Sequence, residues 1–470
     1  MISKNSIVYF LILPYLIISG CADNDTVLDR IIESGELRFV TVNNLSSYIP
    51  APGVNKGFEY DLARKFSDYL GVDLKLIVVS DKNKIPQMIR YGKATIGAAN
   101  FVNKYSYDSL LFSPEYYKVS QQVVYRYGTR EPVDVDDIRY GELVITEIPQ
   151  YIQMMSDVEK LHPQLPWETR SDKDTEELLE LVNKEKVRAT IANSSMVDLY
   201  RNIYPELRVA FNLTKPQSMA WLYRKQPDNS LHDAILKFFN HIKKTGELNR
   251  LIERYFNHFN KFDYIDVRTY LQRIHDRLPE FEPLFRKTAR KYDLDWILLA
   301  AMSYQESHWD PKARSPTGVR GLMMLTLDTA KHLDIINRLD PEQSIDGGAR
   351  YFIQSYNNIP ARIPEPDRTW LALAAYNIGF AHLEDARRLT QKQHLDPDNW
   401  IDVRKTLPLL SQQQWYQHTR YGKARGTEPV TYVENIRRYY DILRWIKYRK
   451  KVNKKKEANI QALTIDPRPL

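Results

Sequence analysis

The stretch DLDWILLAAMSYQESHWDP, residues 293–311, decides the fold of the second half of the chain. Its segment WILLAAM is apolar on almost every side, which is typical of a helix buried in a core. Asp293 or Asp295 can cap the start of this helix by accepting backbone N–H bonds. The residue before Pro311 is biased away from the helical conformation, so we expect the helix to end near His308. The stretch therefore predicts a buried helix within a helical domain.

Glu306 falls in the last turn of this expected helix. The negative end of the helix dipole and apolar neighbours both disfavour an ionised carboxylate there. Apolar residues close by in the sequence could supply such neighbours: Met302, Tyr304, Trp309 and Met323. We therefore expect the pKa of Glu306 to be raised, as a general acid for a glycosidic oxygen requires. A capping or salt-bridged glutamate is the alternative that the spacing leaves open.

Three further motifs follow Glu306 in the chain: GLMML at 321–325, LALAAYNIG at 371–379 and TEPVTYVENI at 427–436. Together with QESHWDP they resemble the soluble lytic transglycosylase family, which has a goose-lysozyme-like fold, over about residues 285–445. The resemblance implies an all-α domain that cleaves peptidoglycan with Glu306 as its single catalytic acid and base. It also implies a set of substrate-binding residues: Ser307, Gly321, Leu322, Met323, Tyr376, Asn377 and Tyr432. Trp309 and the Gly-Leu-Met loop would form walls for a glycan strand.

The implied reaction cleaves the β-1,4 bond between N-acetylmuramic acid and N-acetylglucosamine and leaves a 1,6-anhydromuramic acid end. A hydrolase of the usual kind needs two carboxylates. Asp310 is the local second candidate, but we expect it to face elsewhere because it lies where the helix ends. A hydrolytic muramidase on the same fold and a non-catalytic cell-wall sensor remain open alternatives. No cofactor is expected, and the nearby His, Asp and Glu residues show no metal-ligand spacing.

The first half of the chain alternates short apolar runs with amphipathic helical stretches from residue 37 to about 260. This alternation is typical of βαβ units on a mainly parallel sheet. GFEYDLARKFSDYLG at 57–71 and FSPEYYKVSQQVVYR at 112–126 resemble the periplasmic solute-binding proteins of the amino-acid-binding type. That resemblance implies a two-lobed α/β domain over residues 29–265, which closes on a small ligand.

The ligand of this domain is left open by the sequence. Amino-acid binders of the family usually carry an arginine shortly before the FSPEYY-like segment, for a bidentate grip on a carboxylate. This chain has Lys104 nearby and no arginine, and the family's acidic residue of the second lobe falls near Asn193. A small ligand or a muropeptide could occupy the cleft, and a purely regulatory or docking role is the alternative.

The N-terminal sequence MISKNSIVYFLILPYLIISGCADN has an early cation, a short apolar core and then small residues, which is typical of a secretory signal. Cys21, the only cysteine, follows that core in a segment that resembles a bacterial lipobox. We therefore expect a signal peptide at 1–20 and lipidation of Cys21. Ala22 in the next position favours anchoring at the periplasmic face of the outer membrane. The remaining chain would comprise a linker at 21–28, the solute-binding-like domain at 29–265, the transglycosylase domain at 266–450 and a basic tail at 451–470.

The composition of the 470 residues, 43% hydrophobic and 27% charged, is typical of a globular protein. The net charge of +8 raises the question of a nucleic-acid partner. Much of the excess lies in the run KYRKKVNKKK at 447–456, and such a run is usually a solvated end. No nucleic-acid-binding motif accompanies this run, so we expect no nucleic-acid partner.

Overall fold

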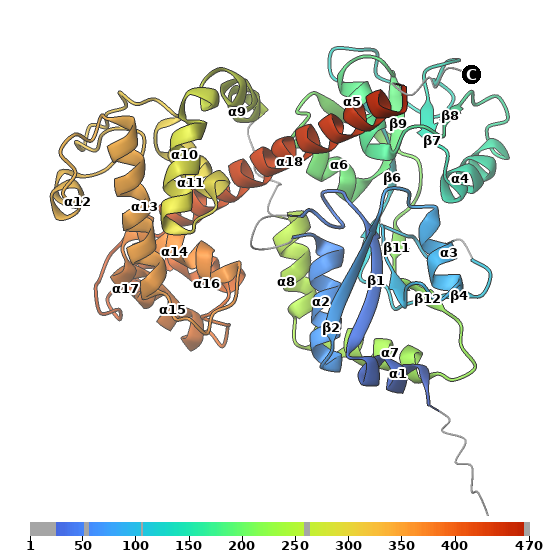
Figure 1. Cartoon of the computed structure of the whole chain (residues 1–470), viewed down its shortest axis with the longest axis horizontal. Coiled ribbons are helices and arrows are strands. Elements are labelled where there is room, and N and C mark those ends of the chain that lie inside the picture. The colour runs from blue at the N-terminus through green and yellow to red at the C-terminus, as the bar shows by residue number, and fades with distance from the viewer. Residues whose placement is uncertain (1–24, 51–55, 105–106, 258–263, 465–470) are drawn as a thin grey trace, which may run out of the picture.

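The computed structural model describes residues 25–50, 56–104, 107–257 and 264–464, in which an α/β half is followed by a helical half (Figure 1). The predicted multidomain fold class is confirmed. The predicted signal peptide and Cys21 lie outside the described residues. Among the helices described, none has both the length and the apolar character needed to cross a bilayer.

The first lobe is built on a five-stranded sheet in the order β2-β1-β3-β12-β4. Its elements are α1 (Val27–Ser34), β1 (Glu36–Val42), α2 (Phe58–Leu70), β2 (Asp73–Val79), α3 (Lys84–Arg90), β3 (Ile96–Gly97), β4 (Leu110–Phe112) and the later strand β12 (Leu222–Arg224). Successive residues of β1 point to opposite faces, as a strand requires. Phe39 packs in one core with Phe66 of α2, and Val40 packs in another with Ile89 of α3. Helices therefore cover both faces of this sheet.

The second lobe contains a three-stranded sheet in the order β10-β6-β9. Its elements are β5 (Tyr117–Val119), β6 (Gln121–Arg126), β7 (Val144–Thr146), α4 (Pro149–Glu159), β8 (Glu168–Arg170), α5 (Thr175–Asn183), β9 (Ala189–Asn193), α6 (Ser194–Arg201), β10 (Leu207–Asn212) and β11 (Gln217–Met219). After β12 the chain continues through α7 (Ser230–Lys244), α8 (Glu247–Ile252) and the π-helical turn η1 (Glu253–Asn257).

The sheets are mixed: β1–β3 and the pair β7–β8 are parallel, as predicted, whereas the other strand pairs are antiparallel, so the prediction of a mainly parallel sheet holds only for these strands. β1 pairs in parallel with β2 and β3, whereas β12 is antiparallel to β3 and β4, and β6 is antiparallel to β9 and β10. The antiparallel pairs made by β6 and β12 have one cause. β6 carries the chain from the first lobe into the second and β12 carries it back, so each enters its sheet from the side of the other lobe.

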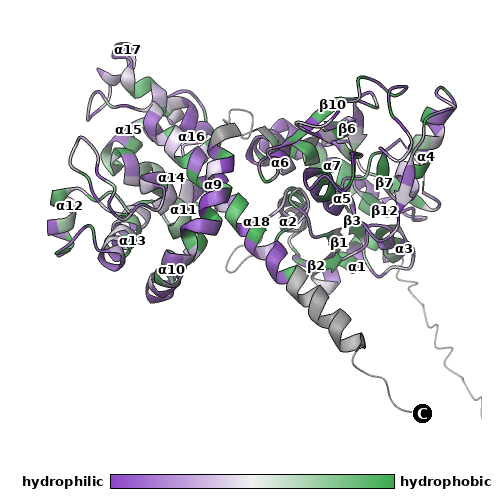
Figure 2. Ribbon diagram, turned by 90° about the horizontal axis from the view of Figure 1, so that it is seen from above, coloured by the Kyte–Doolittle hydropathy of each residue, from purple (hydrophilic) through white to green (hydrophobic). Residues whose placement is uncertain are grey.

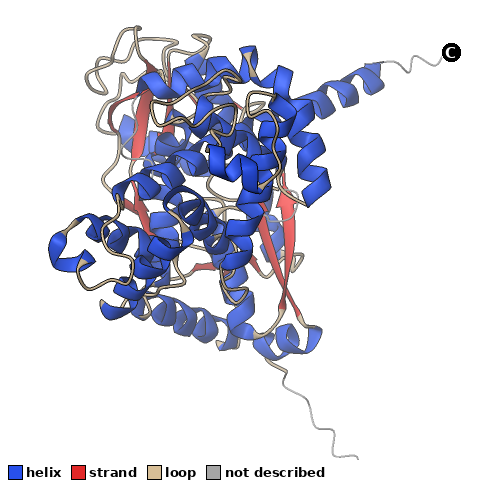
Figure 3. Ribbon diagram, turned by 90° about the vertical axis from the view of Figure 1, so that its left-hand side faces the viewer, coloured by secondary structure: helices blue, strands red, loops and turns tan. Residues whose placement is uncertain are grey.

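The helical half follows residue 264 (Figure 3, where it faces the viewer). Its elements are α9 (Tyr264–Asp276), α10 (Leu278–Tyr292), α11 (Trp296–Ser307), α12 (Leu327–His332), α13 (Pro341–Asn358), α14 (Asp367–Ile378), α15 (Phe380–Lys392), α16 (Trp400–Thr406), the 3₁₀ turn η2 (Leu407–Ser411), α17 (Gln413–Tyr416) and α18 (Thr427–Thr464). The central helices are α11 and α14, which are buried on nearly all sides. The prediction that WILLAAM forms a buried helix is confirmed.

The last helix, α18, packs against both halves of the protein (Figures 1 and 2). Near its start, Val433 and Ile436 lie in the core of the helical half. Two to three turns later Trp445 belongs to the core of the α/β half. Arg449 Nη2 then donates to Glu180 Oε2 of the second lobe at 3.0 Å. One continuous helix is therefore shared by the two halves.

Arg254 of η1 adds an ion-pair connection between the halves. Its Nη2 lies 2.7 Å from Asp367 Oδ2 at the start of α14, and its Nη1 lies 3.6 Å from Asp61 Oδ2 of α2. Asp367 is buried and also accepts the backbone N–H of Trp400. The guanidinium thus neutralises one carboxylate from each half.

Candidate active site and ligand cleft

Glu306 lies in the last turn of α11, as predicted. Asp295 caps this helix by accepting the backbone N–H of Ile297 at 2.9 Å. The helix ends at Ser307 because His308 adopts a left-handed conformation with φ of 53°. Both helix ends thus agree with the capping and proline signals in the sequence.

Two tyrosines from other helices meet the Glu306 carboxyl group. The Tyr432 hydroxyl, on α18, donates a hydrogen bond to Glu306 Oε1 at 2.6 Å. The Tyr376 ring, on α14, lies parallel to the Tyr432 ring with centroids 6.3 Å apart. Tyr351 of α13 packs on Tyr376 at 5.0 Å. The structure therefore brings together three of the predicted site residues, Glu306, Tyr376 and Tyr432, and adds a third tyrosine, Tyr351.

Burial raises the pKa of Glu306 to about 7. The hydrogen bond from Tyr432 acts in the opposite direction, because a donor stabilises the ionised carboxylate. Within the described residues, no other charged side chain contributes to the shift. A carboxyl group with this pKa can both give and take a proton near neutral pH.

A loop at residues 321–325 lies beside the end of α11 and is fixed by three serines. The hydroxyls of Ser303 and Ser307 both donate to the carbonyl oxygen of Leu322, at 3.1 and 2.9 Å. The backbone N–H of Met323 donates to Ser344 Oγ at 3.1 Å. The residue that follows the glutamate therefore holds the neighbouring loop in place.

Two glycines permit the close packing of this loop. Gly321 has φ of +82°, and a Cβ built on it would lie 1.8 Å from the carbonyl oxygen of Arg338. A Cβ on Gly348 of α13 would lie 2.6 Å from the Met323 side chain. Only glycine fits at either position without a shift of the backbone or of a packed side chain.

The structure corrects the expected role of Trp309. Its ring is completely buried, its Nε1 donates to the Ala300 carbonyl at 2.9 Å, and it packs on Tyr270 and Tyr304. Trp309 is therefore part of the core, and the prediction that it forms a wall for the glycan is wrong. The side chains of Leu322 and Met323 are also buried.

The remaining predicted residues lie at the end of α14. Asn377 is exposed directly after Tyr376, and α14 ends at Ile378 before Gly379. Sequence reasoning missed Ser303, Ser344 and Tyr351. A serine inside the apolar segment of α11 is a signal for a buried hydroxyl that must find an acceptor. Nothing in the sequence marks Tyr351.

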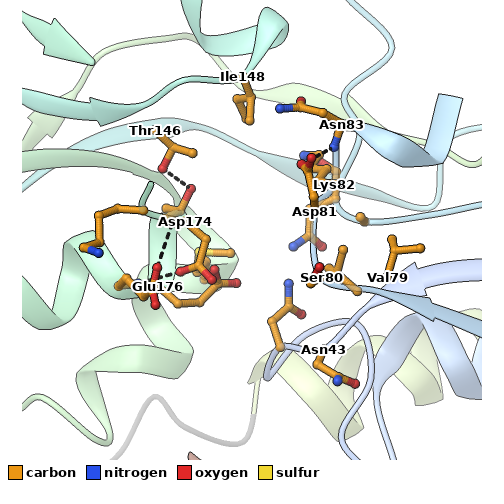
Figure 4. Close-up of a pocket in the computed structure, with 18 of the residues that line it drawn as sticks. Asn43, Val79, Ser80, Asp81, Lys82, Asn83, Thr146, Ile148, Asp174 and Glu176 are labelled. Carbon is orange, nitrogen blue, oxygen red and sulfur yellow. Dashed lines mark hydrogen bonds between the residues drawn. The ribbon is translucent and has the colours of Figure 1, made fainter. Parts of the chain in front are cut away.

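A second candidate site is a cavity of about 560 Å³ between the two lobes of the first half. It lies at the carboxyl ends of β1 and β2, where ligands bind in open α/β sheets. Figure 4 shows Lys82 and Asn83 of the first lobe on one side and Thr146 and Glu176 of the second lobe on the other. The third wall comes from α18, which contributes Trp445, Tyr448, Arg449 and Val452.

The cavity carries a half-buried lysine and a buried carboxyl group on opposite lobes. Burial lowers the pKa of Lys82 to about 8, although Glu176 acts against this change. Burial and the neighbouring Asp174 raise the pKa of Glu176 well above its usual value. The expected Lys104 instead pairs with Asp157 at 3.4 Å and does not line the cavity. Lys82 is the lysine that sequence reasoning missed.

Asn193 does line the cavity, where the resemblance placed it. Its side-chain oxygen already accepts bonds from the Met196 backbone and the Ser195 hydroxyl. It therefore caps α6 as well as facing the cleft. Over the residues that the structure describes, no group of three or more His, Cys, Asp or Glu side chains is arranged to hold a metal ion.

Comparisons with known proteins match both halves of the chain. The family model of the transglycosylase SLT domain matches residues 283–399. The model of bacterial extracellular solute-binding proteins, family 3, matches residues 37–258. The two matches do not overlap, and each falls on the half that has the corresponding architecture.

Curated relatives match almost the whole chain. The membrane-bound lytic murein transglycosylase F of Hahella chejuensis is 45% identical over 435 residues, which cover 91% of this chain and 85% of the relative. The protein of the same name from Idiomarina loihiensis is 43% identical over 448 residues, which cover 94% of this chain and 98% of the relative. These matches extend through both halves.

Solved structures match the first half. The amino-acid substrate-binding protein AbpA of Streptococcus pneumoniae covers 50% of this chain and 100% of its own, at 20% identity and a TM-score of 0.42. The cysteine-binding protein of Campylobacter jejuni covers 51% of this chain and 97% of its own, at 15% identity and a TM-score of 0.43.

Proposed function

The chain belongs to the membrane-bound lytic murein transglycosylase F family and is a peptidoglycan lytic transglycosylase, and we propose that Glu306 is its catalytic acid and base. One observation carries the assignment. Glu306 is a carboxyl group with a pKa near 7 whose hydrogen-bond partner is the Tyr432 hydroxyl. Such a group is protonated in a useful fraction of molecules at neutral pH.

In the proposed reaction, Glu306 first protonates the oxygen that joins N-acetylmuramic acid to N-acetylglucosamine. The N-acetyl group of the muramic residue stabilises the anomeric carbon as the bond breaks. Glu306, now a carboxylate, then takes the proton of the C6 hydroxyl, whose oxygen closes a 1,6-anhydro ring. Tyr432 supports the second step, because its hydrogen bond stabilises the carboxylate between the two proton transfers.

The surroundings of Glu306 favour this reaction over hydrolysis. A muramidase of the usual kind needs a second carboxylate within about 5–10 Å to act on water or on the sugar. Asp310, the carboxylate nearest to Glu306 in the sequence, instead accepts the backbone N–H of Lys312 at 2.9 Å in the turn after α11.

The other predicted site residues have supporting roles in this proposal. Ser307 holds the loop at 321–325 through the Leu322 carbonyl. The half-buried Tyr376 ring offers aromatic surface next to the acid, which suits contact with sugars, and the buried Tyr432 ring packs on it. In this proposal the half-buried Tyr376 and the exposed Asn377 line the path of the glycan, whereas the buried loop residues Gly321, Leu322 and Met323 act through the shape of the loop.

The first prediction tests Glu306 directly. We expect Glu306→Gln to lose about 10²–10⁴-fold in the release of anhydromuropeptides from purified peptidoglycan, because the amide cannot transfer the proton. Mass spectrometry of the soluble products measures the loss. Glu365→Gln is the matched control, because Glu365 also accepts a hydrogen bond from a tyrosine, Tyr356, at 2.8 Å.

Other products would change the assignment. Reducing-end products that disappear in Glu306→Gln would identify a muramidase and direct attention to Asp310. If the wild type bound peptidoglycan and released nothing, the proposed role of Glu306 would be wrong and a sensor would remain.

We propose that the cleft of the α/β half binds a small ligand that carries both an acidic and a basic group. The half-buried Lys82 on one lobe and the buried Glu176 on the other support this class of ligand, because both line the cavity and each could pair there with a ligand group of opposite charge. Peptide fragments of peptidoglycan have both groups. Calorimetric titration with such fragments, using Lys82→Met and Glu176→Gln, tests this proposal.

We also propose that Cys21 is lipidated and holds the protein at the periplasmic face of the outer membrane. The relatives are named as membrane-bound. Cys21 is the only cysteine and directly follows an apolar segment. The intact mass of the purified protein, together with membrane fractionation, would reveal a lipid on Cys21 and the membrane that carries it.

A further inference from the structure

A second open groove, of about 440 Å³, lies in the first lobe at the end of the sheet opposite to the ligand cleft. The cleft is lined by residues at the carboxyl ends of β1 and β2, such as Val42 and Val79. The groove is instead lined by Glu36 and Arg38 near the start of β1 and by Lys75 near the start of β2. Residues of α1, the turn after α3 and β12 complete it.

A row of cations crosses the sheet at this end. Arg38 of β1 is in register with Lys75 of β2. On the other side of Arg38, the backbone N–H of Thr95 donates to the Arg38 carbonyl. Thr95 directly precedes β3, and β3 pairs with β12, which ends at Arg224. Arg30 of α1 adds a fourth cation to the groove.

These charges are only partly neutralised within the protein. Glu36 accepts a bond from Lys75 Nζ at 2.9 Å, and Asp228, whose pKa is lowered chiefly by hydrogen bonds from Ser230, also lies near Arg30. Arg38 and Arg224 are exposed, and within the described residues neither side chain has an ion pair or a hydrogen bond. The groove therefore offers two free guanidinium groups, which suit the oxygens of a phosphate.

We propose that this cationic groove binds the phosphate groups of anionic phospholipids in the membrane that carries the protein. The inference rests on the proposed lipid at Cys21. Val27 is the sixth residue after Cys21, and a fully extended chain over these six steps spans about 20 Å. The first helix, α1, therefore stays within about 20 Å of an anchored Cys21, and the groove lies beside that helix.

The residues beside the groove suit a lipid surface. Ile32 of α1 is 49% exposed and Tyr91, next to the groove residue Gly92, is 72% exposed. Aromatic side chains that have a polar tip are enriched where a protein meets the headgroup region. Figure 1 places α1 at the lower edge of the first half, far from α18. Docking through this face would leave the ligand cleft, at the other end of the sheet, unobstructed.

The experiment uses the acylated full-length mature protein in vesicles of phosphatidylethanolamine, with or without anionic phosphatidylglycerol. Because lipidation blocks Cys21, an introduced cysteine is the only free thiol. A fluorophore on Tyr91→Cys reports contact with lipids that carry a quencher on the headgroup. The control label is placed on Tyr140→Cys of the second lobe, where Tyr140 is 87% exposed.

We expect quenching at residue 91, and none at residue 140, in vesicles that contain the anionic lipid. Each of Arg38→Glu and Arg224→Glu should weaken this contact about fivefold or more, since a cation near an anionic surface contributes about that factor. Arg188→Glu, which reverses an exposed cation of the second lobe, is the matched control and should have no effect.

Equal quenching with and without the anionic lipid, or equal effects of the groove and control substitutions, would overturn the proposal. Binding of inorganic phosphate to the groove, together with quenching at residue 91 that does not depend on the anionic lipid, would assign the groove to free phosphate, which also overturns the proposal. The intact mass of the protein distinguishes a failure of the proposed lipid anchor at Cys21 from a failure of the proposed groove. A protein without lipid on Cys21 refutes the anchor and the groove together, whereas an acylated protein without contact at residue 91 refutes the groove alone.

Discussion

At the scale of single residues, the environment of Glu306 depends on one contact between distant parts of the chain. Tyr432 lies 126 residues after Glu306 and donates directly to its carboxyl group. The position of Glu306 in its helix is predictable, because Asp295 and Pro311 mark the two ends of α11. The contact with Tyr432 is predictable only through the resemblance to a known family, since no local pattern relates residues so far apart.

Trp309 marks the limit of local reasoning. The sequence places it just beyond the helix and beside the acid, which suggested a cleft wall. In the structure both His308 and Trp309 have positive φ, 53° and 56°, and this turn directs the tryptophan back into the core. Two successive left-handed residues other than glycine leave no recognisable signal in the sequence.

A second prediction concerns Tyr432→Phe. Loss of the hydroxyl removes the bond that lowers the pKa of Glu306, so this pKa should rise above its value of about 7. Activity that requires the protonated acid falls as the pH passes this pKa, so the alkaline limb of the pH–rate profile should move to higher pH. The maximal rate should fall about tenfold or more, the usual cost of a charge-assisted hydrogen bond.

The pH–rate profile of the variant on purified peptidoglycan measures this shift. Tyr351→Phe is the control, because the Tyr351 ring packs on Tyr376 and its hydroxyl has no part in the proposed mechanism. An unshifted alkaline limb in Tyr432→Phe would show that the hydrogen bond does not set the working pKa.

At the scale of elements, the loop at 321–325 links the end of α11 to α13. Its backbone is held by hydroxyls from both helices, Ser303 and Ser307 on one side and Ser344 on the other. The motif GLMML identifies the loop in the sequence, but the three serine bonds depend on how the helices pack. The mixed sheets were misjudged for a similar reason, because strand direction depends on the two crossings between lobes.

A third prediction compares two glycines of this region. Gly321→Ala should destabilise the protein by about 3 kcal/mol, because a positive φ and a clash with the Arg338 carbonyl add together. Gly318 has φ of +87° but no atom within 4 Å of a built Cβ, so Gly318→Ala should cost only about 1 kcal/mol. Denaturant unfolding of both variants measures the difference in their free energies of unfolding. Equal losses of stability would mean that the loop adjusts to the added methyl group.

At the scale of the whole molecule, the two halves are joined by more than the chain that connects them. Arg254 pairs with a carboxylate of each half, and α18 packs in both cores. The sequence predicted two domains in the correct order. It gave no indication that the final helix would form the third wall of the ligand cleft, since its basic residues resemble a solvated tail.

A fourth prediction concerns Arg254→Met. The substitution leaves the buried Asp367 without its cation, which should cost about 3–5 kcal/mol and weaken the contact between the halves. We expect thermal unfolding to separate into two transitions and small-angle scattering to show a more extended molecule. Arg64→Met, which breaks an exposed ion pair with Asp68, should change stability by about 0.5 kcal/mol or less. A single unchanged transition in Arg254→Met would contradict the proposed connection.

The shared helix also has a consequence for how the protein is made. Ribosomes synthesise a chain from its N-terminus, so α18 is the last of the described helices to appear. A nascent chain that already contains Glu306 still lacks both Tyr432 and the residues of α18 that close the ligand cleft. A protein that could cut the cell wall is therefore unfinished at both of its sites until almost the whole chain has been produced, and prematurely terminated copies carry neither site intact.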